Sequence, residues 1–359
     1  MKQLYFKLLT FVIASICFQH IGEAQTWKYT VPTVGAGYVQ AMDVATDVSD
    51  NVYTVGSYYD QITSPVSIFG ELASNGYVIK TDPTGTEVFS LNINGNSVIG
   101  KRVALDASGN VFVSGSLSGS AVYFDGFKAE GSLGGPSSTL YDGFIAKYSS
   151  TGTLMWIQAI GSKTADDQIL DMTLDANGDI LVTGYIGGDA KVYGKNYGGI
   201  QGNRGDIFSQ GGATNFLDVV VAKFGNDGTF KWGFSLGSVM GSEKGTAITT
   251  DASNNVYVSG LMFNTVDFDP DLVSSTSSLT GSTPGNGDAF IAKYDKDGSY
   301  LNVGQISGAG LEQINRMHIG TSGVLNVAGT FTGFIDADPR SGNVQNITAA
   351  GTGKDILFA

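Results

Sequence analysis

A segment that recurs along the chain constrains the fold more than any other feature. Its first half, of the form D-A-S-G-N-V-F-V-S-G, occurs at Asp47–Gly56, Asp106–Gly115, Asp175–Gly184, Asp251–Gly260 and, more loosely, Gly320–Gly329. Its second half, of the form F-I-A-K-Y-x-x-x-G, occurs at Tyr77–Thr86, Phe144–Thr153, Val220–Thr229 and Phe290–Ser299, and begins again at Ile356. Short β-branched and aromatic runs bounded by Asp, Asn, Ser and Gly predict strands joined by tight turns.

The spacing of the half-motifs separates framework from loops. From each motif lysine to the next closing glycine the chain takes 35, 37, 37 and 36 residues, whereas from glycine to lysine within a unit it takes 24, 32, 39 and 33. Constant length indicates packed framework, and variable length indicates surface insertions. In the fourth unit we expect strands at 246–250, 256–262, 289–294 and 299–306, and a short extra strand at 265–268 within the insertion.

Tandem four-stranded antiparallel units favour a β-propeller over a β-solenoid, because the units are too long for one solenoid rung. The sequence therefore predicts an all-β propeller domain over residues 25–359 with five visible blades. The blades are expected at about 41–95, 100–161, 169–237, 245–308 and 314–359. The last is incomplete, so we expect a truncated sequence. Alternatively, the segment 26–30, which resembles a fourth strand, completes the last blade.

Residues 1–24 have the pattern of a secretory signal peptide. Lys2 and Lys7 precede an uncharged apolar run, and Gly22 and Ala24 supply the small residues of a cleavage site. We therefore expect a protein that is secreted or displayed at the cell surface. No later segment is apolar for long enough to span a bilayer.

Removal of the leader would leave 18 basic and 32 acidic residues, a net charge of 18 − 32 = −14, from totals of 20 and 33. An acidic chain is a poor partner for nucleic acid or an anionic membrane. Its only Cys, Cys17, lies in the leader, and His318 is the one remaining His, which we expect to be packed and neutral. This inventory excludes Cys/His nucleophilic triads and the common zinc sites.

The D-A-S-G-N-V-Y-V-S-G pattern followed by D-A-F-I-A-K-Y-D-x-x-G resembles the secreted bacterial β-propeller (SBBP) repeat. The resemblance covers about 27–359, essentially all of the mature chain. It implies an exported propeller, in a family whose members often carry a C-terminal sorting domain for type IX secretion. It leaves the biochemical role open.

Two acidic segments at matching positions in the insertions are candidate calcium sites, because clustered carboxylates on a loop are oxygen ligands that Ca²⁺ prefers. They comprise Asp267, Asp269 and Asp271 in the fourth unit, and Asp336 and Asp338 in the fifth. The alternative is a charged hairpin edge that resists aggregation. The Asp-rich turns that open each repeat are better explained by turn hydrogen bonds than by calcium.

A second acidic set, Asp167, Glu243 and Glu312, lies eight residues before the repeat start in the last three units, where the first two have Val39 and Val98. We expect these carboxylates to surround one mouth of the central channel and to bind a ligand or a cation there. The alternative is that they cap turns. Trp156 and Trp232 share one strand position, which favours packing between blades over sugar stacking.

These observations favour a non-enzymatic propeller that binds a protein or an extracellular glycan through the face carrying its insertions. Two alternatives stay open. One is a glycoside hydrolase or lyase that uses two of the candidate carboxylates about 5–10 Å apart. The other is a structural spacer within a larger exported protein.

Overall fold

The computed structural model confirms the prediction of an all-β protein: its described residues form strands and turns and include no α-helix. It follows that none of them forms a helix capable of crossing a membrane. The structure describes residues 34–35, 38–64, 68–119, 122–124, 127–128, 140–162, 165–196, 206–209, 216–271, 277–282, 286–340, 342–351 and 353–359. The predicted signal peptide and the predicted strand at 26–30 lie outside these residues.

Four successive units each contain four antiparallel strands, which we call a to d in chain order. The first comprises β2 (Val39–Thr46), β3 (Val52–Ser64), β4 (Ile68–Thr81) and β5 (Glu87–Asn94). The second comprises β6 (Ser97–Leu105), β7 (Val111–Ser118), β10 (Tyr141–Tyr148) and β11 (Leu154–Gly161). A two-residue strand, β1 (Val34–Gly35), pairs with β3.

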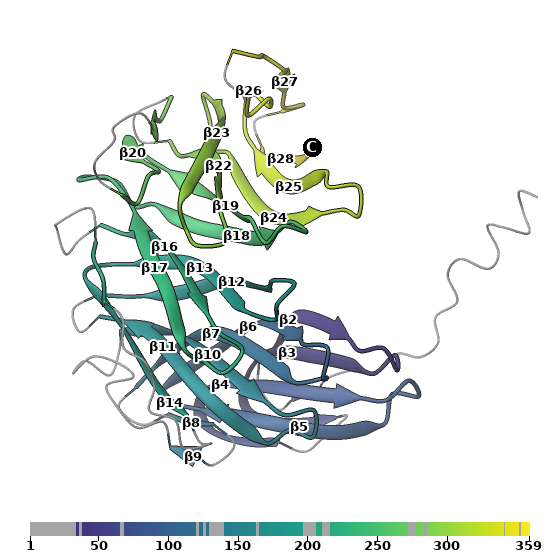
Figure 1. Cartoon of the computed structure of the whole chain (residues 1–359). Helices are drawn as coiled ribbons and strands as arrows, with labels where there is room; N and C mark the ends of the chain where they lie inside the picture. Colours follow the sequence, from purple (N-terminus) through teal and green to yellow (C-terminus); the bar gives the residue numbers. More distant parts are fainter. Residues whose placement is uncertain are drawn as a thin grey trace, which may run out of the picture.

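The third unit comprises β12 (Gln168–Leu174), β13 (Ile180–Ile186), β16 (Asp218–Phe224) and β17 (Phe230–Leu236). The fourth comprises β18 (Lys244–Thr250), β19 (Val256–Met262), β22 (Asp288–Tyr294) and β23 (Tyr300–Gly308). The fifth contributes strands a to c: β24 (Gln313–Ile319), β25 (Leu325–Phe331) and β28 (Asp355–Phe358). Figure 1 shows the units following one another from purple to yellow.

Asx hydrogen bonds form the turn between strands a and b. In the fourth unit the Asp251 carboxylate accepts hydrogen bonds from the backbone N–H groups of Ser253 and Asn255, both at 2.9 Å. Asn254 takes a positive φ of 62°, a region that Asn tolerates better than most residues. The same pattern recurs at Asp47, Asp106 and Asp175. The Asp-rich starts of these repeats therefore form turns, as their composition predicts.

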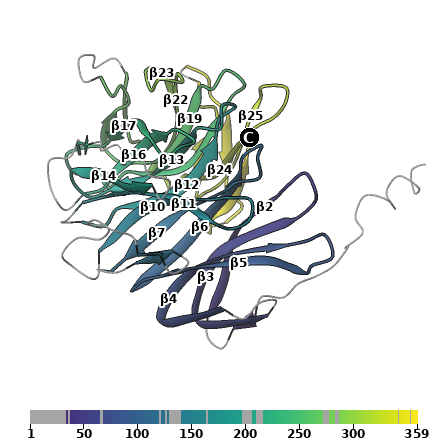
Figure 2. The ribbon, with the colours of Figure 1, turned by 60° about the horizontal axis from the view of Figure 1, so that its bottom comes forward.

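The a strands of successive units contact one another, so they form the inner wall of the assembly. Each carries a register irregularity at the same place, between Ala41/Asp43, Gly100/Arg102, Ile169/Asp171, Gly245/Ala247 and Ile314/Arg316. Such an irregularity adds an unpaired residue and turns the following side chain. In Figure 2, β24 of the last unit lies near β2 of the first. An ion pair of 3.6 Å between Arg316 and Asp43 links these two strands.

Three of the insertions between strands b and c fold onto the d strand of the preceding unit. β8 (Tyr123–Phe124) pairs with β5, β14 (Ala190–Asn196) pairs with β11, and β26 (Phe334–Asp336) pairs with β23. Each of these strands continues into a hairpin partner: β9 (Phe127–Lys128), β15 (Asp206–Ile207) and β27 (Asn346–Thr348). The short strand expected in the variable segments is confirmed, and pairing with the preceding unit makes these three insertions partly framework.

Apolar clusters join neighbouring units. One packs Phe112 and Ile145 of the second unit against Ile169 and Val182 of the third. Three corresponding clusters join the first to the second unit, the third to the fourth, and the fourth to the fifth. The sheets thus pack face to face, and each buries its apolar side chains against its neighbours in the sequence.

Candidate functional site

Lysines in strand c form ion pairs with the aspartates that open the repeats. The pairs are Lys80–Asp47 at 3.6 Å, Lys147–Asp106 at 3.5 Å, Lys223–Asp175 at 2.8 Å and Lys293–Asp251 at 3.6 Å. In three of the four units the ammonium also lies over an aromatic ring of strand b, at Tyr53, Phe112 and Tyr257. The repeated Asp and Lys residues therefore maintain the framework within each unit.

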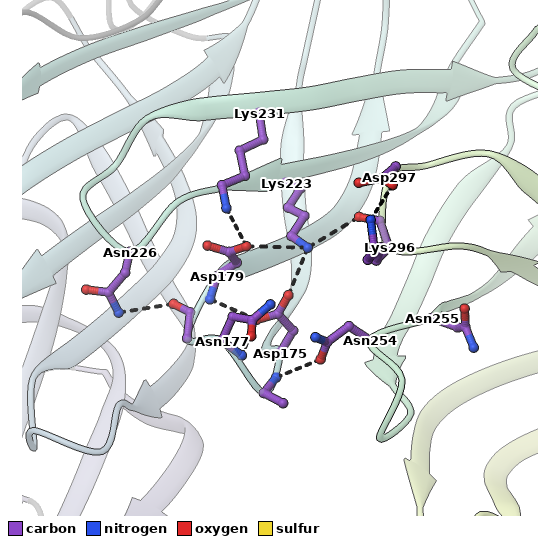
Figure 3. A network of polar contacts seen from close by, with 12 residues as sticks. Asp175, Asn177, Asp179, Lys223, Asn226, Lys231, Asn254, Asn255, Lys296 and Asp297 are labelled. Atoms are coloured by element: carbon purple, nitrogen blue, oxygen red, sulfur yellow. Dashed lines mark hydrogen bonds and ion pairs between the residues drawn. The ribbon is translucent and has the colours of Figure 1, made fainter.

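The third unit varies this arrangement, as Figure 3 shows. Leu181 occupies the aromatic position, and a second carboxylate, Asp179, contacts Lys223 at 3.4 Å and Lys231 at 2.5 Å. Lys223 Nζ also donates to the carbonyl oxygen of Lys296 in the next unit at 3.3 Å. Buried charges need such partners, because removing one leaves the other uncompensated.

The turn between strands c and d docks onto the preceding unit. Lys147 Nζ and Trp156 Nε1 of the second unit both donate to the carbonyl oxygen of Asn226 in the third, at 3.2 and 3.1 Å. Trp232 Nε1 and Lys223 Nζ of the third unit donate in the same way to the Lys296 carbonyl, both at 3.3 Å. Equivalent tryptophans thus mark equivalent joints between units.

The two joints differ in how well the tryptophan is covered. Trp156 is buried, with 2 % of its surface exposed, and β14 pairs along its strand from Trp156 to Gly161. Trp232 is partly exposed, because its strand, β17, pairs only with β16 among the described residues. The insertion facing it forms a separate two-stranded ribbon of β20 (Thr265–Asp267) and β21 (Ser278–Thr280). The sequence interpretation of both tryptophans as packing residues is therefore incomplete.

A hollow of about 540 Å³ opens where this joint is uncovered. One wall is aromatic: the rings of Trp232 and Phe234 are stacked, with centroids 5.7 Å apart and planes 7° apart. The other walls are the loop Asp269-Pro270-Asp271 and the turn Asp297–Tyr300. An aromatic platform bordered by three carboxylates can hold a ligand that has an apolar face and hydrogen-bond donors or positive charge.

The acidic loops make turns of their own. Asp267 accepts hydrogen bonds from Asp269 N at 3.1 Å and from Ser277 Oγ at 2.5 Å, and Asp269 accepts one from Asp271 N at 3.0 Å. The described part of the chain brings together no three His, Cys, Asp or Glu side chains that could hold a metal ion. The calcium hypothesis therefore has no assembled ligand set in its support.

The fifth unit repeats the loop with a different charge. Asp336 accepts hydrogen bonds from Asp338 N and Gln345 N, at 3.1 and 2.8 Å. Asp338 pairs with Arg340, and this contact holds the pKa of its carboxyl down at about 2. Arg340 occupies the place of Asp271, so Asp-Pro-Arg replaces Asp-Pro-Asp. The acidic character of the hollow is therefore specific to the fourth unit.

The predicted carboxylate ring exists as a repeated position but not as an open ring. Asp167, Glu243 and Glu312 are all fully buried. Asp167 accepts hydrogen bonds from Ser162 N and Gly187 N at 2.5 and 2.9 Å. Glu243 accepts bonds from Ser238 N, Ser238 Oγ and Phe263 N. Each carboxyl thus ties the end of one unit to strand b of the next, and the alternative of turn capping describes these two best.

Burial raises the pKa of all three carboxyl groups, to about 6 for Asp167, about 7 for Glu243 and about 8 for Glu312. For Glu312 the neighbouring carboxylate of Asp288 adds to the rise. Neither Glu312 oxygen meets a donor in good hydrogen-bond geometry among the described residues. Desolvation disfavours the charged form, which explains the direction in all three cases.

Three further findings differ from the sequence interpretation or go beyond it. His318 is exposed, so the expectation of a packed histidine is wrong. Asp171 binds both Arg102 and Arg316 at the inner wall. Trp232 is open beside the hollow. A recurring aromatic position is the only sequence signal for that tryptophan, and it does not distinguish the open case from the closed one.

Comparisons with known proteins agree with a repeat architecture. No protein-family profile matches the chain. An uncharacterised WD repeat-containing protein of Acanthamoeba polyphaga mimivirus is 26 % identical over 320 residues, which cover 75 % of this chain. The chain spans only 22 % of the length of that protein.

Among solved structures, the extracellular domain of a putative one-component system of B. thetaiotaomicron aligns with 87 % of this chain and 55 % of its own. The identity is 11 % and the TM-score is 0.19, too low to carry an argument. The chain is an all-β repeat protein, and its distant WD-repeat relative suggests a propeller.

Proposed function

We propose that this chain is an exported β-propeller of the secreted bacterial repeat type and that it binds an extracellular glycan without catalysis. The ligand site is the hollow between the third and fourth units. Support for export comes from the leader pattern, and support for the propeller comes from the tandem four-stranded units with contacting a strands. Type IX secretion remains part of this proposal through the family resemblance alone.

The observation that carries the proposal is the uncovered Trp232–Phe234 stack. Burying large aromatic rings is favourable, and at the equivalent joint Trp156 is covered. A partly exposed stacked pair inside a hollow leaves apolar surface for a ligand to cover. The volume of about 540 Å³ falls within the roughly 300–1,000 Å³ of small-ligand sites.

The lining selects the ligand chemistry. The apolar C–H face of a sugar ring can pack on an aromatic surface, while its hydroxyl groups donate to carboxylate oxygens. Asp269, Asp271 and Asp297 line the hollow, and their charge opposes uronic or sulfated sugars. A neutral glycan therefore fits best. A Lys or Arg side chain of a protein partner is the competing ligand, because cations also bind between aromatic faces and carboxylates.

Of the five carboxylates that the hydrolase alternative could use, Asp167, Glu243 and Glu312 are buried at successive joints, and Asp338 is paired with Arg340. Asp269 lines the hollow, so a hydrolase would need to pair it there with a carboxylate outside the predicted set. The spacer alternative makes a different prediction, since a spacer has no ligand.

A glycan array with neutral and anionic members, followed by intrinsic fluorescence titration of each hit, tests the proposal. Trp232 is the partly exposed tryptophan of the described residues, so we expect a bound neutral glycan to change its emission. Trp232→Ala should weaken binding by about tenfold or more, as loss of an aromatic anchor does. Trp156→Phe is the matched control and should keep the affinity.

Glycans that bind the Trp232→Ala variant as tightly as the wild-type protein would contradict the assignment of the hollow as the binding site. Binding of Lys- or Arg-rich peptides in place of glycans would shift the function to a protein partner. Failure of both ligand classes to bind the folded protein would leave the spacer role.

A further inference from the structure

The a strands carry a layer of paired charges along the inner wall of the molecule. Directly after the register irregularity of each a strand stand Asp43, Arg102, Asp171, Ala247 and Arg316. Asp171 contacts Arg102 Nε at 2.5 Å and Arg316 Nη1 at 3.0 Å, and Arg316 reaches Asp43 at 3.6 Å. Two arginines and two aspartates therefore neutralise one another in this layer.

The adjoining layer contains two lysines without such compensation. Lys101 stands at the irregularity of β6, and Lys244 is the first residue of β18. Lys101 is buried, with 9 % of its surface exposed, and its Nζ donates to the Oε1 atom of Gln168 at 2.8 Å. Lys244 Nζ lies 4.9 Å from the ring centroid of Tyr185, which fixes its position. Within the described part of the chain neither lysine forms an ion pair.

This absence is unusual here, because the four strand-c lysines all have carboxylate partners. The carboxyl groups nearest in sequence to Gln168 and Lys244 are Asp167 and Glu243, and both accept hydrogen bonds from backbone N–H groups. Burial and the charges of Arg102 and Lys244 lower the pKa of the Lys101 amine to about 8. Burial disfavours the charged form of an amine, and neighbouring cations add to this effect.

We propose that Lys101, Lys244 and Gln168 form a binding site for a small oxyanion at the entrance of the inner wall formed by the a strands. A carboxylate or sulfate group would accept charge-assisted hydrogen bonds from the two ammonium groups and a neutral one from the Gln168 amide. Lys244 and Gln168 are partly exposed, so the ligand reaches the site from solvent, and the buried Lys101 is held by its hydrogen bond to Gln168. This site is independent of the hollow at Trp232.

Isothermal titration of the full chain with sodium sulfate, against sodium chloride at matched ionic strength, tests the site. We expect saturable sulfate binding that Lys244→Met weakens by about tenfold or more, the loss expected for one charge-assisted hydrogen bond. The matched control is Lys191→Met, because Lys191 is 60 % exposed and pairs with Asp206 elsewhere on the surface. Absence of saturable binding, or equal affinity in Lys244→Met, would overturn the proposal.

A second measurement needs no variant and so does not depend on the folding of one. The lysines of the wild-type protein are acylated in sodium sulfate and, separately, in sodium chloride. Mass spectrometry then measures the labelling rate of each lysine in each salt. Sulfate should slow the labelling of Lys101 and Lys244 by severalfold and leave Lys191 unchanged. Equal labelling rates of Lys101 in both salts would also refute the site.

Discussion

The joint between the second and third units and the joint between the third and fourth use the same parts with different results. In each, a tryptophan and a lysine of one unit donate to a turn carbonyl of the next. In each, a buried acid links the end of one unit to strand b of the next. The first joint is closed over Trp156, and the second is open over Trp232.

The difference lies in the insertion that follows. A seven-residue strand, β14, extends the sheet at the closed joint, whereas the three-residue β20 turns away through Asp269-Pro270-Asp271 at the open one. Framework contacts thus maintain the joint, and the pairing of the insertion with the d strand decides whether the tryptophan is covered. Variation in a segment outside the repeated motif can create a site without disturbing the repeat.

The largest expected effect is on stability when each tryptophan is removed. Trp156→Ala should lower the free energy of unfolding by about 3–5 kcal/mol, because it leaves a cavity in a closed core. Trp232→Ala should cost about half as much or less, since its ring is partly solvated already. Guanidinium unfolding followed by circular dichroism measures both. Equal losses would show that the joints are equally closed in solution.

The next largest effect is the pH dependence of stability, which should differ between the buried carboxyl groups of Asp167 and Glu243. A carboxyl whose pKa is raised in the folded state binds more protons than the unfolded chain, so its contribution to stability falls as pH rises. For Glu243 the loss runs from about pH 4.5 to beyond its folded pKa of about 7, and for Asp167 from about 3.8 to beyond about 6. The size is on the order of 1–3 kcal/mol for each group.

Urea unfolding between pH 4 and 8 tests this difference. Glu243→Gln should flatten the decline of stability up to pH 7 and above, whereas Asp167→Asn should flatten it at lower pH. A wild-type profile that rises throughout this range, with both variants parallel to it, would contradict the raised pKa values.

The smallest effect concerns the glycines beneath the two rings. Gly228 and Gly298 both have positive φ, at 86° and 91°. A Cβ at Gly228 would meet the buried Trp156 ring at 2.9 Å, and one at Gly298 would meet Trp232 at 3.2 Å. Alanine at either costs about 1–2 kcal/mol in backbone strain, and Gly228→Ala should cost more because its ring cannot move away.

Gly323→Ala isolates the backbone strain, because Gly323 has a φ of 78° and no atom within 4 Å of an added Cβ. In thermal melts, Gly228→Ala should have a lower melting temperature than either Gly298→Ala or Gly323→Ala. Identical melting temperatures would mean that the closed joint yields as easily as the open one.

Much of the framework was predictable because local chemistry determines it. The strand expected at 256–262 matches β19, and the one expected at 289–294 matches β22 within a residue, since β-branched residues between turn formers leave few alternatives. The register irregularity of strand a was not predictable. Met42, Lys101, Leu170, Thr246 and Asn315 occupy it, and they share no property that a sequence pattern could reveal.

The candidate site was harder to predict because its exposure depends on distant residues. Trp156 and Trp232 occupy one strand position in the repeat, and the fold of a later insertion decides which one solvent reaches. Likewise, the acids at 167, 243 and 312 occupy a repeated position as expected. Their burial, however, depends on hydrogen bonds to neighbouring strands that no local pattern shows.

The joints also give the array a direction. In both joints the tryptophan and lysine belong to the earlier unit, and the accepting turn belongs to the later one. The insertion likewise reaches back from later to earlier. Such an interface is heterologous: its two surfaces differ, and neither can pair with a copy of itself. Copies of one unit that associated through these two surfaces would therefore do so head to tail, as rings or open filaments, and not as two-fold dimers.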